Sequence, residues 1–360
     1  MAKSHDKLDV SEIGKPQALV QAQRDCAKRL GAQRAYILSA PSFEALVAEL
    51  GLVDGAQGAP EGGAQHGAAD AAQRAFEAAA QQGVDRAAQH GITARFVNIL
   101  GDAGLEVAHL PTMKSQAEAA GELLICDNTS LSCGTCAACR LGAHLSIEEL
   151  TAGSFLVGLS SDVHTDAPKL EAQLAQLQSQ NVPDANQQHA LLDHLATLDE
   201  RCRKQSDNAA VIARYLSCHP KVGWCAYPGL ANHPSRSYAD KIIVGGFGPH
   251  VDLTLRPASS EDYVRVVRTF DEAARGQSGT APRLKLRRVD LRTAHPHAAN
   301  ERFAPSAQGA PDTQLADPAQ QYAHSQSGAS ATPHHYLRYT AGTGSARDEV
   351  MQFEGALFEL

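Results

Sequence analysis

Three cysteines lie three residues apart near the middle of the chain. Cys133, Cys136 and Cys139 form two overlapping Cys-x-x-Cys units. This spacing can bind zinc or an iron–sulfur cluster, or it can act as a redox dithiol. A metal site needs a fourth ligand, for which Cys126 and His144 are close in the sequence. The alternative is structural, because cysteine is often a small buried residue.

The apolar pattern predicts the elements that would position such residues. Strands that alternate with helices favour a parallel sheet. We expect strands at 35–38, 94–100, 123–126, 222–227, 251–255 and 334–341. We expect helices at 16–31, 168–182, 187–217, 261–275 and 347–359, and the end of another at 116–121. Asp127 directly follows the third strand, where an aspartate often accepts hydrogen bonds from the next turn.

Composition sets limits on the class of protein. A chain of 360 residues can hold two domains, and its net charge of -8 argues against nucleic acid as a partner. No apolar run approaches the roughly 20 residues of a membrane helix, and the polar N-terminus lacks a signal peptide's apolar stretch. Eight cysteines without a secretory signal predict reduced thiols and a cytoplasmic protein.

Several motifs stand in a fixed order along the chain. Residues 198–234 combine a long helix with the strand and loop HPKVGWCAYPGLANHP, and Asp127-Asn128-Thr129 precedes Gly142-Ala143 and Thr151. These motifs, with residues 11–16 and Tyr336-Leu337-Arg338, resemble the cystathionine γ-synthase family. That family comprises pyridoxal-phosphate (PLP) enzymes of cysteine and methionine metabolism. The resemblance covers most of the chain except a degenerate segment at 45–92 and a loose one at 303–333.

The resemblance implies an architecture and an assembly. It implies an α/β protein with the aminotransferase fold, type I. A large PLP domain with a mixed seven-stranded sheet, residues 1–200, is followed by a small α+β domain, residues 201–360. Residues 1–15 form an N-terminal arm. Family members assemble as tetramers built from dimers, so we expect a homo-oligomer or a hetero-oligomer with an active paralogue.

The resemblance also assigns the residues around the cofactor. It places Asp127 against the pyridine nitrogen, Ser39 in the phosphate turn and Asp102 near the phenolic oxygen. Arg338 matches the arginine that binds the substrate carboxylate through two hydrogen bonds, although an arginine near a C-terminal strand is often a surface charge. The lysine that forms the Schiff base falls on Ala152. A methyl group can neither hold the cofactor nor move protons.

Other residues expected to contact the cofactor also depart from the family pattern, and each change removes a favourable contact. In the phosphate turn, Ala40 resists the glycine conformation and Pro41 has no N–H to donate. Where the family supplies Tyr-x-Arg from the neighbouring subunit, this chain has Val10 and Glu12. The residues that remain, Asp127 among them, are therefore interpreted as vestigial.

Three functions follow as hypotheses. The first is a catalytically impaired homologue of the transsulfuration enzymes that serves as a scaffold or regulatory paralogue. The second is an active PLP-dependent carbon–sulfur lyase or transferase that uses another lysine. The third is a thiol or metal protein that relies on residues 133–139.

Overall fold

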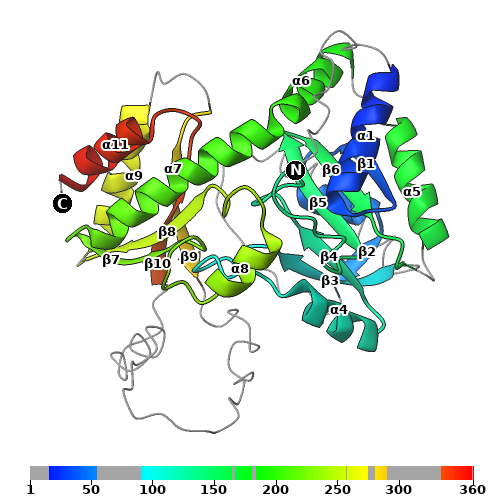
Figure 1. The fold of residues 1–360 in the computed structure, drawn as a ribbon, viewed down its shortest axis with the longest axis horizontal. Coiled ribbons are helices and arrows are strands. Elements are labelled where there is room, and N and C mark those ends of the chain that lie inside the picture. The colour runs from blue at the N-terminus through cyan, green and yellow to red at the C-terminus, as the bar shows by residue number, and fades with distance from the viewer. Residues whose placement is uncertain are drawn as a thin grey trace, which may run out of the picture.

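Two β-sheets, one in each half of the chain, organise the protein (Figure 1). The long helix α7 (Leu198–Cys218) runs from the larger lobe to the smaller one. The computed structural model describes residues 16–54, 91–163, 167–180, 184–256, 258–274, 280–289, 334–358 and 360. The expected arm at 1–15, the loose segment at 303–333 and most of 45–92 lie outside the described residues.

The sheet of the larger lobe is mixed. Its order is β1-β6-β5-β4-β3-β2, in which β2 to β5 run parallel while β6 is antiparallel to both β5 and β1. The strands are β1 (Arg34–Ser39), β2 (Leu52–Asp54), β3 (Ile92–Asn98), β4 (Leu123–Asp127), β5 (Leu145–Thr151) and β6 (Ser154–Leu159).

Both faces of this sheet are covered, which explains its apolar strands. Side chains alternate along a strand, so Phe155 and Val157 of β6 join one core cluster and Leu156 joins another. The first cluster includes side chains of two helices, α2 (Phe43–Glu49) and α5 (Ala167–Gln180). The second includes side chains of α1 (Pro16–Leu30) and α6 (Ala185–Ala196). Elsewhere α4 (Leu110–Ala119) packs on β4.

The smaller lobe is an antiparallel sheet with helices packed against it. Its order is β7-β8-β10-β9, and every neighbouring pair is antiparallel. Its core contains side chains of all four strands and of three helices, α7 among them. The elements are β7 (Val222–Ala226), β8 (His250–Leu255), α9 (Ser260–Ala274), β9 (Arg283–Val289), β10 (His334–Thr340) and α11 (Ala346–Phe358). The helix α8 (Arg236–Ile242), between β7 and β8 in the chain, packs in a core cluster of the larger lobe.

Several expectations need correction. The single helix at 187–217 is wrong, because the chain forms α6 and α7 with a break at Thr197. The strand expected at 94–100 is β3, which begins and ends two residues earlier. The apolar pattern favoured a parallel sheet, but the sheet is mixed, as the resemblance implied, because β5 and β6 form a hairpin.

The described strands of the large sheet number six, where the resemblance implied seven. The division at residue 200 stays a prediction and would fall inside α7. Among the helices of the described ranges, none combines the length and apolarity needed to cross a bilayer.

Candidate functional site

Ala152 lies at the tip of the hairpin between β5 and β6. Thr151 pairs with Ser154, so Ala152 and Gly153 alone form the turn. Gly153 has a φ of +75°, in the left-handed region that favours glycine. Its carbonyl accepts a hydrogen bond of 3.0 Å from the N–H of Ala40, and Ala152 is exposed. The hairpin is therefore held by backbone bonds, and its tip faces solvent.

At the turn after β1, the N–H groups of Ala40 and Ala45 are hydrogen-bonded within the protein. Ser39 pairs with Ser154, which brings the expected phosphate turn beside the hairpin. The Ser42 side chain caps α2 by accepting a hydrogen bond of 3.2 Å from the N–H of Ala45. Pro41 has no N–H to offer. This helix end thus carries its own cap, where a phosphate-binding helix would leave its N–H groups free.

Asp127 ends β4 and orders the turn that follows. Its Oδ1 accepts a hydrogen bond of 2.9 Å from the N–H of Thr129. This bond fits the structural interpretation of an aspartate that caps the next turn. A cofactor role for Asp127 stays a prediction.

Arg338 is buried on β10 and paired with a carboxylate. It is 9 % exposed, so the surface-charge interpretation is wrong. Its Nε and Nη2 donate to Asp252 of β8 at 2.8 and 2.9 Å. Burial raises the pKa of Asp252, although the hydrogen bonds from Arg338 oppose that shift. The group that the resemblance assigns to a substrate carboxylate already binds a carboxylate of the protein.

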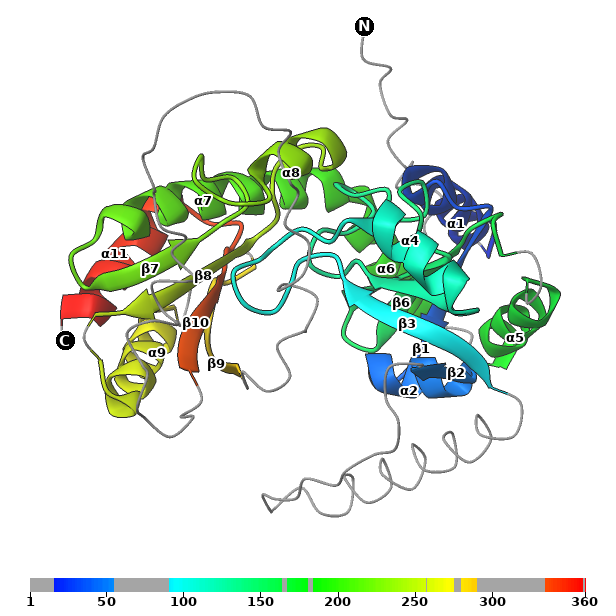
Figure 2. The ribbon, with the colours of Figure 1, turned by 90° about the horizontal axis from the view of Figure 1, so that it is seen from below.

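The same pair joins the two lobes. Arg338 also donates to the carbonyl oxygens of Gly101 and Asp102, and Asp252 accepts a hydrogen bond of 3.1 Å from the N–H of Gly104. These residues lie on the loop between β3 and α4, which reaches β8 and β10 (Figure 2). Asp102 is exposed, and its backbone oxygen rather than its carboxylate makes these contacts. Asp102 and Arg338 therefore meet through the backbone of Asp102, while their expected roles at the cofactor and the substrate stay predictions.

No lysine of the chain lies between Lys114 and Lys169, a span that includes the whole hairpin. Lys114 forms ion pairs with Asp162 at 2.6 Å and Glu118 at 3.7 Å. Lys221 donates to the carbonyl oxygen of Leu357 at 2.7 Å. The remaining candidates, Lys169, Lys204 and Lys241, lie on α5, α7 and α8.

The cysteine cluster is buried and its thiols are protonated. Burial raises the pKa of Cys136 and Cys139 to about 12, and a side-chain contact with Cys26 and burial raise that of Cys133. The Cys139 thiol donates to the carbonyl oxygen of Gly158 on β6. Across the described ranges, no three His, Cys, Asp or Glu side chains are grouped to hold a metal ion.

Glu148 is a buried carboxyl group that the sequence patterns did not single out. It lies on β5 with 1 % exposure. It accepts hydrogen bonds from Asn128 Nδ2, Ser132 Oγ and Cys133 N at 3.3, 3.1 and 2.6 Å. Burial raises its pKa to about 7, and these bonds oppose the rise. The only sequence signal was a pair of glutamates inside an otherwise apolar segment.

Comparison with known proteins identifies the family. Residues 68–274 match the family described as Cys/Met metabolism PLP-dependent enzymes. The chain belongs to this family. The match covers more than half of the sequence and confirms the resemblance found in the motifs.

Similar proteins and structures agree with that assignment. Homocysteine synthase of Schizosaccharomyces pombe is 45% identical over 86 residues, which is 23% of this chain and 20% of that protein. Cystathionine gamma-synthase of Mycobacterium bovis is 30% identical over 156 residues, 41% of this chain and 39% of that protein. The chain thus aligns with less than half the length of these curated relatives.

Solved structures confirm the fold. A methionine gamma lyase from Micromonospora echinospora matches with a TM-score of 0.60 and 18% identity, over 96% of this chain and 88% of that one. A cystathionine gamma synthase from Xanthomonas oryzae matches with a TM-score of 0.60 and 20% identity, over 99% and 89%. The type I fold expected from the motifs is therefore correct.

PLP is the cofactor of this family, but the residues described above do not fit it. The resemblance places the amine position at Ala152, which carries only a methyl group, and Ser42 already caps the helix at the expected phosphate turn. Arg338 is engaged by Asp252.

Proposed function

We propose that this member of the PLP-dependent transsulfuration family is catalytically impaired and acts as a cytoplasmic scaffold or regulatory paralogue. It assembles with itself, as a dimer or tetramer, or with an active homologue. The observation that carries the proposal is the exposed, two-residue turn at Ala152, in a span of sequence without lysine.

Physical chemistry supports the loss of catalysis. A lysine reacts with a carbonyl group when burial or neighbouring charge lowers its pKa. The exposed tip of a hairpin offers neither effect. Lys114 is engaged in ion pairs with Asp162 and Glu118. Neither position offers an unpaired amine to a cofactor.

Retention of the scaffold supports a role in assembly. Both sheets and their apolar cores are intact within the described ranges. Large apolar side chains of α11 are exposed on the smaller lobe, with Met351 and Phe358 at 62% and 87%. Exposed apolar side chains on a folded lobe suit contact with another subunit.

A titration with PLP tests the catalytic part of the proposal. The purified protein is titrated while absorbance is followed, then treated with borohydride and digested for mass spectrometry. We expect no saturable spectral change and no reduced adduct on a single lysine. An adduct mapped to one lysine would contradict the proposal and favour an active carbon–sulfur lyase or transferase.

The assembly part needs its own measurement. Native mass spectrometry of the chain alone, and of the chain mixed with an active homologue, distinguishes homo-oligomers from mixed ones. We expect a dimer, a tetramer or a mixed assembly. A monomer under both conditions would contradict the scaffold role.

A further inference from the structure

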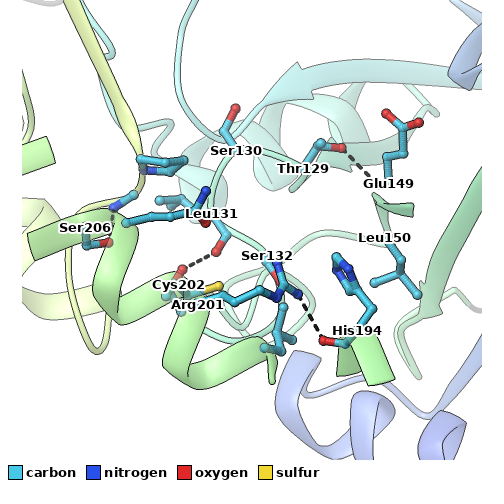
Figure 3. A pocket seen from close by; sticks show the side chains of 15 residues that line it. Thr129, Ser130, Leu131, Ser132, Glu149, Leu150, His194, Arg201, Cys202 and Ser206 are labelled. Carbon is cyan, nitrogen blue, oxygen red and sulfur yellow. Dashed lines mark hydrogen bonds between the residues drawn. The ribbon is translucent and has the colours of Figure 1, made fainter. Parts of the chain in front are cut away.

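A small pocket lies where α6 and α7 meet the loop after β4 (Figure 3). Its volume is about 110 Å³, and its polar lining includes Arg201, His194, Ser130, Ser132 and Glu149. None of the residues that the family resemblance assigns to the cofactor lines it. The pocket is therefore a separate feature from the expected PLP site.

Arg201 brings an uncompensated positive charge to this pocket. Its Nε donates to Thr197 Oγ1 at 3.2 Å and its Nη2 to the carbonyl oxygen of His194 at 3.0 Å. Both acceptors are neutral, and no carboxylate of the described residues forms an ion pair with Arg201. Burial lowers the pKa of Arg201 because its desolvation is not offset. An anion beside the guanidinium would offset it.

Apart from Glu149, the polar side chains that line the pocket with that cation are neutral. Burial and the charge of Arg201 lower the pKa of His194 to about 4, so its imidazole is neutral at pH 7. The Ser130 hydroxyl lines the same pocket. The Ser132 hydroxyl already donates to Glu148 Oε1. Hydroxyl and imidazole groups can donate hydrogen bonds to an oxyanion without adding negative charge.

We propose that this pocket binds a small oxyanion through Arg201, with a carboxylate as the preferred chemistry. Pockets for drug-sized ligands have volumes of roughly 300–1,000 Å³, so this one suits an anion of a few atoms or the end of a larger acid. Glu149 lies at the pocket and is exposed. Its negative charge disfavours a dianion relative to a monoanion.

The test uses the full chain and two defined anions. Acetate and inorganic phosphate are titrated separately at pH 7 and constant ionic strength, with binding followed by calorimetry. We expect saturable acetate binding and weaker phosphate binding. Stronger phosphate binding would assign the pocket to inorganic oxyanions. No saturable binding of either anion would overturn the proposal.

Two arginines of α7 provide a matched pair of variants. Arg201→Gln should weaken acetate binding about tenfold or more, because a charged hydrogen-bond donor is lost. Arg203→Gln removes an exposed charge two residues away and should leave binding nearly unchanged. Equal affinity in the two variants would contradict a site at Arg201.

A readout on the unmodified protein covers the case in which Arg201→Gln does not fold. The His194 ring is followed by NMR during a pH titration, with and without acetate. A bound anion should raise the pKa of His194 from its low value, because it offsets the repulsion from Arg201. A His194 pKa that does not respond to acetate would contradict the proposal.

Discussion

Two buried carboxylates, Asp252 and Glu148, are held in different ways. Asp252 lies between the lobes with an arginine as partner, whereas Glu148 lies inside the larger sheet with only neutral donors. A cation stabilises the ionised carboxylate directly, while neutral donors only partly replace its hydration. We therefore expect Asp252 to be sensitive to loss of its partner and Glu148 to be sensitive to pH.

The largest effect should follow removal of the cation. Arg338→Met leaves Asp252 buried without a partner and should cost about 3–5 kcal/mol of the free energy of unfolding. Urea denaturation measures the loss. Arg288→Met, an exposed change on the neighbouring strand β9, is the control and should cost less than about 0.5 kcal/mol. A loss for Arg338→Met as small as the control would mean that Asp252 is hydrated.

The free energy of unfolding should depend on pH because of Glu148. Its folded-state pKa of about 7 exceeds the ordinary value of 4.5. Its contribution to stability is therefore complete below about pH 4.5 and is lost as the pH rises to about 7. The loss is about 3 kcal/mol. Glu148→Gln should remove this slope, as measured by denaturation at several pH values.

The adjacent glutamate provides the control for that slope. Glu149 is exposed, so Glu149→Gln should keep the pH dependence of the unmodified protein. If the two variants have the same pH profile, the titration does not belong to Glu148.

A smaller loss of stability should follow removal of one neutral hydrogen-bond donor to Glu148. Ser132→Ala removes the hydroxyl that donates to Glu148 Oε1 and should cost about 1 kcal/mol. Because this bond favours the ionised form, its loss should also move the pH-dependent window upward. Ser130→Ala, on the same loop, is the control: it tests whether the loss of another hydroxyl on that loop also moves the pH-dependent window. An unchanged window in Ser132→Ala would show that the bond is weak.

The smallest effect should be at the hairpin tip, away from both carboxylates. Ala152→Lys adds a long side chain to an exposed position and should change stability by less than about 0.5 kcal/mol. The new amine stays solvated and protonated at neutral pH, so borohydride should trap no PLP on it. A trapped adduct at residue 152 would show that only the lysine is missing from the cofactor site.

Sequence patterns predicted the elements whose interactions are local. The apolar run at 123–126 is β4, and the helix expected at 261–275 is α9, shifted by one residue. The strand β5 was missed because Glu148 and Glu149 interrupt the apolar run that signals a buried strand. Glu148 can be buried because Asn128, Ser132 and Cys133 donate hydrogen bonds to it, and only the folded structure brings these donors together.

The candidate site was predictable only in part, for a similar reason. Motif order placed Asp127, Ala152 and Arg338 in one family frame. The partner of Arg338 could not be read from the sequence, because Asp252 is 86 residues away. The pocket at Arg201 was also missed, because its residues come from four separate segments, within 129–135, 149–150, 194–206 and 248–249.

The buried Glu148 also links unfolding to the release of a proton, which the buffer takes up. Near pH 6 its carboxyl group is mostly protonated in the folded protein and mostly ionised in the unfolded chain. Unfolding at this pH therefore releases close to one proton from this residue. A scanning calorimeter would register that transfer as an unfolding enthalpy that changes with the ionisation heat of the buffer.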